Sequence, residues 1–336
     1  MSIENPPRAH AVMHADAFSL LFDDSRRARF AQLADTADRM LITDVDDPAH
    51  AALLAGTEVL ITSWGAPRLD AARLARMPRL RAVLHAAGSV QGLVSDELWE
   101  RGIRVTSAVD ANAVPVAEFT LGAILLAGKR TFTHLRAPHD DTWSAWSERG
   151  IGNVDRTVGV VGFSRIGRRV VELLQPFDGI RVLVADPYAD ADAVAAAGAT
   201  LLPLGEMLPQ VSVLSLHAPA LPATHHMIAA AELAALPDGA TLINTARGAL
   251  VDHEALLGEC RTGRLDALLD VTEPEPLPPG HGLLSLPNVA ITPHLAGSLG
   301  TETRRLADAA LDELAAYAAG EPARHPITRE ELAISA

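Results

Sequence analysis

The chain has 336 residues, which is long enough for two domains of ordinary size. Its composition, with 49% hydrophobic and 21% charged residues, is that of a globular protein with ample material for a core. The net charge of -14 argues against nucleic acid or an anionic membrane as a partner, because both require a basic surface.

Features of the whole chain also bear on its location in the cell. A single cysteine, Cys260, excludes an internal disulfide and fits a reducing compartment; a packed or surface position suits it better than a role as nucleophile. The first residues lack the basic start and apolar run of a signal peptide. The most apolar helical run, residues 118–128, is too short to span a bilayer. We therefore expect a soluble cytoplasmic protein with no membrane partner.

The first third of the chain alternates between strand-like and helix-like segments. Residues 57–63, 80–88 and 103–108 are short apolar runs typical of buried strands. Helical patterns lie between them, around residues 70–77 and 95–101. This alternation predicts a parallel sheet with helices on both faces.

A long helical pattern over residues 112–130 separates this part from a second alternating series. After a looser stretch containing Trp143 and Trp146, six strand-like segments occur at residues 157–162, 181–186, 212–218, 240–246, 265–271 and 288–293. Six such strands with short helices between them predict a doubly wound sheet. The last helical pattern, residues 301–320, has no strand after it, and we expect it to return to the first domain.

The first strand of the second series ends in a turn that is similar to a dinucleotide-binding motif. The pattern Gly-x-Gly-x-x-Gly is met by Gly162 and Gly167, but Ser164 stands at the middle position. Serine adds only a small side chain, which carries no steric penalty if its φ is negative. We hypothesise that the turn binds a dinucleotide at the start of the following helix, the alternative being a plain connection.

The second strand of this series ends in an acidic residue that bears on cofactor choice. Asp186 lies roughly twenty residues past the glycine-rich turn, where a carboxylate binds the ribose hydroxyls of NAD. It would repel the additional 2′-phosphate of NADP, and residues 186–192 contain no Arg or Lys to receive one. We therefore predict NAD as the cofactor.

Four later motifs identify a family by resemblance. They are "SVLSLHAPALPAT" (residues 212–224), "LINTARGALVD" (242–252), "LDVTEPEPLP" (269–278) and "ITPHLAGS" (291–298). In this order they resemble the D-isomer-specific 2-hydroxyacid dehydrogenases, a group that includes phosphoglycerate dehydrogenases and glyoxylate or hydroxypyruvate reductases. The resemblance implies an α/β protein with two doubly wound parallel-sheet domains. A Rossmann NAD-binding domain (residues 111–299) would be inserted into a flavodoxin-like substrate domain (residues 1–110 and 300–336).

The same resemblance implies that Arg247, Glu275 and His294 are catalytic. Reduction of a 2-keto acid places negative charge on the carbonyl oxygen, and a protonated His294 would deliver a proton and stabilise that charge. Glu275 would favour the protonated imidazole and hold its orientation, and Arg247 would grip the substrate carboxylate in a planar fork. Singly, these residues also have ordinary alternatives: a surface ion pair, a solvated loop position and a structural histidine.

The remaining site residues also follow from the resemblance. Those expected beside the cofactor are Gly162, Ser164, Arg165, Ile166, Gly167, Asp186, His217, Ala218, Pro219, Thr224, Thr245, Ala246, Asp270 and Gly297. Those expected to bind substrate are Trp64, Gly88 and Ser89, together with Arg247 and His294. Ser89 departs from the family's glycine-rich pattern and either adds a hydroxyl or only replaces a turn glycine, and Trp64 either narrows the pocket or only packs.

No metal site is expected, because the adjacent His225 and His226 lack useful helical spacing and the acidic residues are scattered. The residues thus predict an NAD-dependent D-2-hydroxyacid dehydrogenase acting on a small 2-keto or 2-hydroxy acid. A reductase specialised for glyoxylate or hydroxypyruvate and an NADH-sensing corepressor are the alternatives. The resemblance also implies a homodimer formed through residues 112–154, with Trp143 and Trp146 as anchors.

Overall fold

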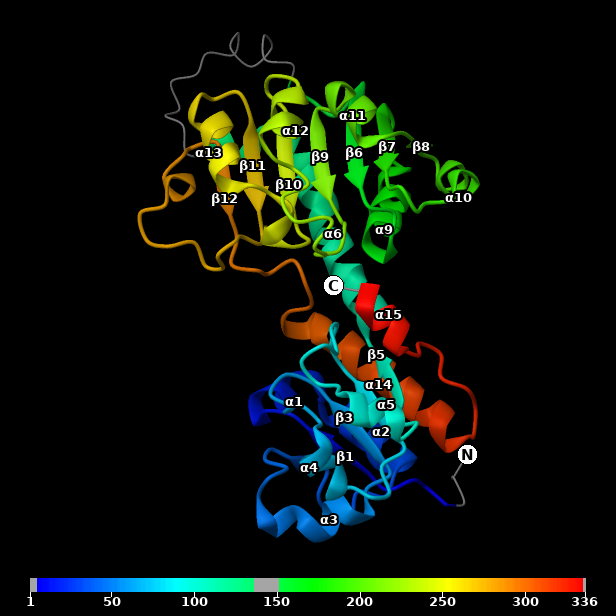
Figure 1. Cartoon of the computed structure of the whole chain (residues 1–336). Coiled ribbons are helices and arrows are strands. Elements are labelled where there is room, and N and C mark those ends of the chain that lie inside the picture. The colour runs from blue at the N-terminus through cyan, green and yellow to red at the C-terminus, as the bar shows by residue number, and fades with distance from the viewer. Residues whose placement is uncertain (1–4, 136–150, 335–336) are drawn as a thin grey trace. The chain divides into compact units, whose positions relative to one another are not determined.

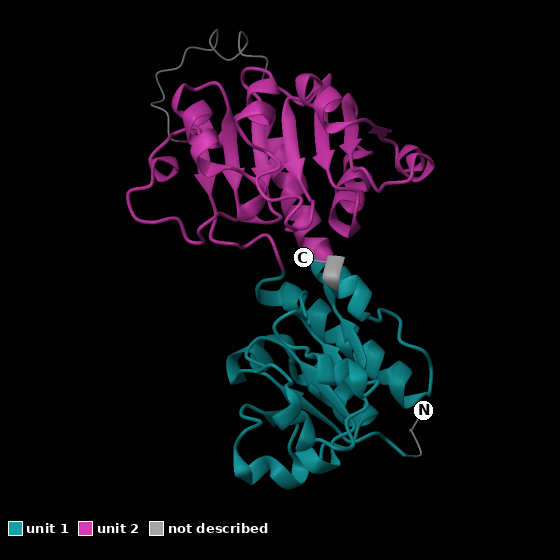
Figure 2. Cartoon of the chain, viewed as in Figure 1, with its two compact units in different colours: residues 1–112, 298–336 teal, residues 113–297 magenta. Residues whose placement is uncertain are grey.

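The computed structural model describes residues 5–135 and 151–334 and divides the chain into two compact units. Unit 1 comprises Met1–Asn112 and Ser298–Ala336, and unit 2 comprises Ala113–Gly297 (Figures 1 and 2). The chain leaves unit 1 within helix α6 (Val109–Ala127) and returns to it between Gly297 and Ser298. Each unit contains one parallel sheet, so the predicted fold class is confirmed.

Unit 1 is built on a five-stranded parallel sheet in the order β2-β1-β3-β4-β5, the flavodoxin-like arrangement. Its strands are β1 (Ala9–Val12), β2 (Leu41–Ile42), β3 (Val59–Thr62), β4 (Ala82–His85) and β5 (Arg104–Ser107). Strands β3 to β5 were predicted, whereas β1 and β2 were not. The strand β2 has only two residues, and β1 contains His10, which is fully buried with its Nδ1 2.9 Å from Thr57 Oγ1.

Helices cover both faces of this sheet. They are α1 (Ala15–Leu21), α2 (Asp24–Leu33), α3 (Ala51–Gly56), α4 (Ala71–Ala75), α5 (Asp96–Glu100), α14 (Thr303–Ala318) and α15 (Arg329–Ile334). Helix α14 joins α1 and α2 over one face, where Leu306 and Leu311 pack with Phe22 and Phe30. Ion pairs from Arg26 to Asp308 and from Arg29 to Asp312, both 2.5 Å, link α2 to α14. Helix α14 therefore completes the core of the first unit, from which it is distant in sequence, and that core depends on it.

Unit 2 is built on a seven-stranded parallel sheet in the order β12-β11-β10-β9-β6-β7-β8. Its strands are β6 (Arg156–Val161), β7 (Ile180–Ala185), β8 (Thr200–Leu201), β9 (Val213–Leu216), β10 (Thr241–Asn244), β11 (Asp266–Leu269) and β12 (Val289–Ile291). All six predicted strands are present, and β8 is an additional two-residue strand. The strand order reverses direction between β6 and β9, which makes the carboxyl ends of these two strands the topological switch point where ligands bind in such sheets.

Among the residues that the structure describes, the helices of unit 2 are most of α6, α7 (Thr131–His134), α9 (Arg165–Leu174), α10 (Ala191–Ala196), α11 (Leu204–Met207), α12 (Ala230–Ala235) and α13 (His253–Arg261). Short 3-10 helices occur in the two units at Pro48–His50, Leu208–Gln210, Gly248–Leu250, Gly282–Leu284 and Gly300–Glu302. Figure 1 shows α9 at the end of β6 and α13 beside β11.

Helix α6 is longer than the apolar run from which the sequence excluded a membrane span. With 19 residues it is long and apolar enough to cross a bilayer by length and composition, a test that core helices of soluble proteins also pass. In unit 2, Ala117, Ile124 and Ala127 pack in one cluster with Val158 and Val160 of β6. This packing makes α6 a core helix against the sheet.

The return of α14 to unit 1 gives a stability prediction. Leu306 is fully buried in the core that α14 completes, so Leu306→Ala should lower the free energy of unfolding by about 2–5 kcal/mol. Leu299 is 52% exposed, so Leu299→Ala should change it by less than about 0.5 kcal/mol. Urea unfolding followed by circular dichroism measures both variants, and equal stability of the two would contradict the packing described for α14.

Candidate active site

The glycine-rich turn connects β6 to α9 at the switch point of the unit 2 sheet. Gly162 has φ +93°, and a Cβ there would lie 2.8 Å from backbone atoms of His217 and Ala218. A Cβ on Gly167 would lie 1.9 Å from the carbonyl oxygen of Gly162. Gly162 is therefore required for the close approach of the turn to the residues after β9, and Gly167 for the close approach of α9 to the turn.

Ser164, the departure from the glycine pattern, adopts φ -84° and ψ -159° at the N-cap of α9. This is ordinary extended backbone, so the serine causes no steric penalty. Its side chain does not cap the helix, and its Oγ lies 3.5 Å from the carbonyl oxygen of His217. Arg165 and Ile166 begin the helix, whose first turn presents backbone N–H groups and the positive end of the helix dipole to an anion.

Asp186, directly after β7, is tied to the same turn. Its Oδ2 accepts a hydrogen bond of 2.8 Å from the Phe163 N–H, and its Oδ1 accepts one of 2.9 Å from the Tyr188 N–H. The carboxylate is thus fixed beside the glycine-rich turn, where the sequence placed a group for ribose hydroxyls.

His217, after β9, is buried at the switch point. Its Nε2 lies 2.8 Å from Ser215 Oγ, while its Nδ1 has no hydrogen-bond partner among the described residues. Burial lowers the pKa of His217 to about 3, so its imidazole is neutral at physiological pH. A neutral ring with one unpaired buried nitrogen is a polar group that a bound ligand can satisfy.

The other expected cofactor residues follow the ends of β9, β10 and β12 or lie close to them. Thr224 closes the loop after β9, since its hydroxyl donates to the Pro219 carbonyl oxygen (2.6 Å) and accepts from the Leu221 N–H (2.9 Å). Thr245, after β10, pairs its hydroxyl at 2.9 Å with that of Thr120 on α6. Ala218 and Ala246 are buried, and Gly297 ends unit 2. Thr224 and Thr245 hold loop backbone in place in this structure.

The three expected catalytic residues follow three neighbouring strands of the same sheet. In the register of the ladder, Asn244 pairs with Leu269 and Leu269 with Ile291. Arg247 and His294 each come three residues after a member of this row, and Glu275 comes six residues after Leu269. Because the strands are parallel, all three residues lie at the carboxyl edge of the sheet.

His294 and Glu275 are in direct contact. His294 Nδ1 lies 2.6 Å from Glu275 Oε1, with side-chain exposures of 53% and 42%. The backbone of His294 has φ +53°, a left-handed conformation that is uncommon outside glycine and is found at functional sites. The pair therefore leaves the far side of the imidazole accessible while its Nδ1 is engaged.

Asp270, one of the residues expected beside the cofactor, is buried beneath the His294 loop. Its Oδ1 accepts hydrogen bonds from Thr292 Oγ1 (2.6 Å) and the Leu295 N–H (2.8 Å), and its Oδ2 accepts one from the Ala296 N–H (2.9 Å). Its backbone carbonyl accepts from the His294 N–H at 3.0 Å. In this structure the carboxylate of Asp270 organises the backbone on both sides of His294.

Arg247 is positioned by two residues that the sequence analysis did not single out. Asn244 accepts from the Ala246 N–H (3.0 Å) and donates to the Arg247 carbonyl oxygen (2.8 Å), which shapes the turn after β10. A Cβ on Gly248 would lie 2.1 Å from the carbonyl carbon and oxygen of Thr272, so the Arg247 loop packs directly on the loop that leads to Glu275. An asparagine at a strand end is a turn signal, and it marks this arrangement in the sequence.

In unit 1, the expected substrate residues gather at the carboxyl edge of its sheet. Trp64 follows β3 and is 44% exposed, and Gly88 and Ser89 follow the neighbouring β4. His85, at the end of β4, is buried with its Nδ1 2.9 Å from Thr62 Oγ1. Burial lowers the pKa of His85 to about 4, so this histidine is a neutral member of the sheet.

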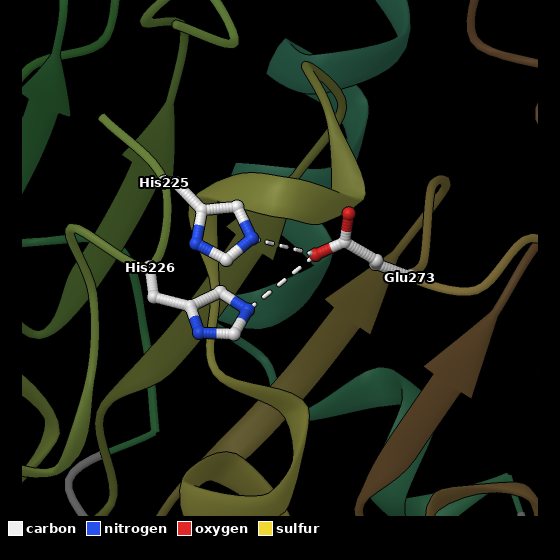
Figure 3. A group of neighbouring side chains, drawn as sticks. All are labelled: His225, His226 and Glu273. Atoms are coloured by element: carbon white, nitrogen blue, oxygen red, sulfur yellow. Dashed lines mark ion pairs between the residues drawn. The ribbon is translucent and has the colours of Figure 1, made fainter. Parts of the chain in front are cut away.

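His225 and His226, dismissed as metal ligands on helical spacing, do not lie in a helix. They occupy a turn in which His226 has φ +51°, and their rings stack with centroids 3.9 Å apart. Both Nε2 atoms lie 3.4 Å from Glu273 Oε2 (Figure 3). The spacing argument was therefore wrong for these residues, because two adjacent side chains converge when the second adopts a left-handed backbone.

Two other expectations concern single residues. Cys260 is packed in α13, and burial raises the pKa of its thiol to about 12, which makes it an unreactive core residue. Trp143 and Trp146, the expected dimer anchors, lie outside the described residues.

Comparison with known proteins places the chain among oxidoreductases. Residues 121–296 match the family model described as D-isomer specific 2-hydroxyacid dehydrogenase, NAD binding domain. A glyoxylate reductase from Aeropyrum pernix is 32% identical over 278 residues, which cover 80% of this chain and 82% of the relative. A D-3-phosphoglycerate dehydrogenase from Mycobacterium tuberculosis is 32% identical over 294 residues, 86% of this chain and 55% of the relative.

A solved structure extends the likeness to the whole fold. D-lactate dehydrogenase with NAD+ from Lactobacillus jensenii superimposes with a TM-score of 0.78 over 96% of this chain and 100% of that chain. Its sequence identity is 21%, so this likeness concerns the fold.

The geometry of the glycine-rich turn predicts how two substitutions affect NADH affinity. Ser164→Gly should change the dissociation constant by less than about tenfold, because the serine already adopts an unstrained backbone. Gly162→Ala should abolish binding, because the Cβ would collide with the end of β9. Titration of NADH fluorescence measures both, and a Ser164→Gly protein that binds far more than tenfold tighter would show the serine to be a defect.

The two buried histidines predict a dependence of stability on pH. The folded state keeps His85 and His217 neutral, whereas the unfolded chain protonates them below the ordinary value of 6.5, so the unfolded state binds more protons between that value and the folded pKa. Stability should therefore fall as the pH falls through this window, by on the order of 2 kcal/mol per residue between pH 7 and 4.5.

His85→Asn isolates one of these contributions, because asparagine retains a polar atom for Thr62 but does not titrate. Its free energy of unfolding, measured with urea at pH 7 and 4.5, should drop by less than that of the wild type. An identical drop in the two proteins would contradict the buried neutral state of His85.

Proposed function

Because this chain belongs to the D-isomer-specific 2-hydroxyacid dehydrogenase family, and is therefore an NAD-dependent oxidoreductase acting on the CH–OH group of 2-hydroxy acids, we propose that it reduces a small 2-keto acid with His294 as the acid–base residue. Glyoxylate is the substrate that we test first. The observation that carries the proposal is the contact of 2.6 Å between His294 Nδ1 and Glu275 Oε1 at the edge that also bears Arg247.

The proposed chemistry assigns one role to each of these residues. When bound, NADH supplies the hydride that the carbonyl carbon gains. His294 Nε2 donates its proton to the carbonyl oxygen, and the C=O double bond becomes the C–OH single bond of the product. Glu275 accepts the hydrogen bond from Nδ1–H and stabilises the imidazolium before the proton leaves. In the oxidative direction the neutral His294 takes the hydroxyl proton.

In this proposal Arg247 binds the substrate. Its planar guanidinium suits a bidentate contact with the substrate carboxylate, which lysine cannot reproduce. The turn held by Asn244 and the packing of Gly248 on Thr272 fix the backbone from which this side chain extends.

The residues of unit 2 fit NAD. The first turn of α9, left uncapped by Ser164, would hold the pyrophosphate, and Asp186 would hold the ribose hydroxyls. The unpaired buried Nδ1 of His217 lies at the switch point where the family's cofactor binds. We assign the neighbouring Arg165, Ile166, Ala218, Pro219 and Gly297 to the walls of this site.

A small, unphosphorylated acid is the proposed substrate. The glyoxylate reductase from Aeropyrum pernix, a relative named for such an acid, is 32% identical over 80% of this chain. The segments after β3 and β4, which we assign to substrate binding through Trp64, Gly88 and Ser89, carry Arg68 as their one Arg or Lys in residues 63–70 and 86–92. A phosphate would require a cluster of such residues.

We further propose that the protein is a cytoplasmic homodimer. Its two subunits would contact each other through the NAD-binding domain, which corresponds to unit 2. Two observations support the proposal. Members of the family commonly dimerise through this domain, and Leu135 and Val154, at the borders of the described residues, are exposed apolar side chains. Light scattering at working concentration measures the assembly.

The direct test is consumption of NADH with glyoxylate, pyruvate, hydroxypyruvate, phenylpyruvate and 2-ketoisocaproate. We expect turnover to be fastest with glyoxylate and to fall as the side chain of the acid grows. His294→Asn, chosen because asparagine tolerates the left-handed backbone, should lower kcat by roughly 10²–10⁴-fold. Glu275→Gln should lower kcat less and change its pH profile, and Arg247→Lys should raise KM.

His325→Gln is the matched control, because His325 also forms an exposed pair with a carboxylate (Nδ1 to Asp110 Oδ2, 2.9 Å). It should leave turnover unchanged. Activity that survives in His294→Asn would refute the proposed role of His294. Firm NADH binding without turnover of any acid would instead favour the NADH-sensing alternative.

A further inference from the structure

A second cluster of titratable side chains lies beside the catalytic loops and takes no part in the proposed reaction. His225 and His226 belong to the turn after β9, and Glu273 belongs to the loop that carries Glu275 (Figure 3). One ligand atom from each residue lies within 4.8 Å of the other two. Two imidazoles and a carboxylate are a donor set that divalent transition metals bind.

We propose that His225, His226 and Glu273 form a binding site for a divalent transition-metal ion of the Zn2+ type. The distance of 3.4 Å from each Nε2 to Glu273 Oε2 supports the proposal. Tetrahedral ligands at the usual Zn–N and Zn–O lengths of about 2.0–2.1 Å stand about 3.3 Å apart. The carboxylate therefore already lies at ligand spacing from both nitrogens.

The two rings have room to complete the geometry. They stack at an interplanar angle of 24°, so their Nε2 lone pairs must turn toward each other to share one ion. The side chains are 54% and 39% exposed, which leaves them free to tilt, and Glu273 is 44% exposed. Three protein ligands leave a fourth tetrahedral position for water. Metal binding requires an unprotonated Nε2 on each ring, so the ion competes with protons for these two nitrogens.

The backbone around the cluster is fixed by contacts that do not involve the three side chains. The His226 N–H donates to the Ala249 carbonyl oxygen at 2.7 Å, and the Ile228 N–H donates to that of Leu250 at 3.0 Å. The packing of Gly248 on Thr272 and Glu273 holds the third segment. A held backbone lowers the entropic cost of binding, and the bound ion would tie the turn after β9 to the Glu275 loop.

One further titratable residue lies near the cluster. His253 is close enough for charge interactions with Glu273 and His226, and burial lowers the pKa of its imidazole, which disfavours a second positive charge there. The net charge of the chain is -14, which also favours cation binding.

Isothermal titration of the full chain with ZnCl2, in the absence of NADH and chelators, tests the proposal. We expect one Zn2+ per chain and a rise in the midpoint of thermal unfolding, because the ion binds only the folded site. His226→Asn keeps a residue that tolerates the left-handed backbone, and Glu273→Gln removes the charge at an exposed position. Each should weaken binding by more than tenfold, since even outer-shell changes cost roughly 10–100-fold.

Two further variants separate this site from others. His294→Asn removes the catalytic pair and should bind Zn2+ as the wild type does, and His325→Gln should do the same. A wild-type chain that binds no Zn2+, or a His226→Asn protein that binds as the wild type, would overturn the proposal. Loss of binding in His294→Asn alone would place the ion at the catalytic pair and would overturn it equally. None of these readouts depends on turnover. The metal-site proposal can therefore be refuted while the proposed reaction stands, and the proposed reaction can be refuted while the metal site stands.

Discussion

The site in unit 2 depends on the buried carboxylate of Asp270. It is 2% exposed, and its two oxygens accept hydrogen bonds from a hydroxyl and two backbone N–H groups of the segment that contains His294. Hydrogen bonds to a charged group are each worth about 1.5–3 kcal/mol, and an unmet buried charge costs more. In the loop conformation that provides these hydrogen bonds to Asp270, His294 adopts a left-handed backbone and its side chain contacts Glu275. The strain at His294 is offset by the hydrogen bonds beneath it.

A similar constraint acts at the switch point in the middle of this sheet, between β9 and β6. Gly162 permits a contact between the turn after β6 and the end of β9 that no side chain could fit, and Gly167 permits α9 to start against the carbonyl of Gly162. The contact buries His217 and directs the first turn of α9 toward the switch point. Asp186 binds the same turn through the Phe163 N–H. The residues that we propose to bind the cofactor are thus positioned by backbone packing first and by side-chain chemistry second, and Ser164 fits this packing with an unstrained backbone.

Much of this architecture could be predicted from the sequence, because parallel strands buried on both faces leave strong apolar runs. The six predicted strands of unit 2 followed from such runs. The expected roles of Arg247, Glu275 and His294 followed from the family resemblance that the motifs at the strand ends carry, and they remain predictions. The strands β2 and β8 were missed because two residues carry no pattern, and β1 was missed because His10 interrupts its apolar run. The roles of Asn244 and Gly248 were missed for another reason: they act through contacts with loops distant in sequence. The spacing rule failed at His226 because it assumed a helix where the chain turns through a left-handed residue.

The packing that positions the loop carrying Glu275 also explains the second cluster. Gly248 brings the Arg247 loop against Thr272 and Glu273, and the backbone after His226 pairs with residues 249 and 250. Glu273 and Glu275 lie two residues apart on one loop, and each meets a histidine: Glu275 meets His294, and Glu273 meets the pair at 225 and 226. One loop thus holds two carboxylates in two environments. Glu275 contacts one imidazole, an arrangement suited to proton transfer, and Glu273 contacts two imidazoles, an arrangement suited to binding a cation. An ion bound at the second would restrain the loop that positions the first, which gives the metal proposal a physical route to the reaction without any contact with the substrate.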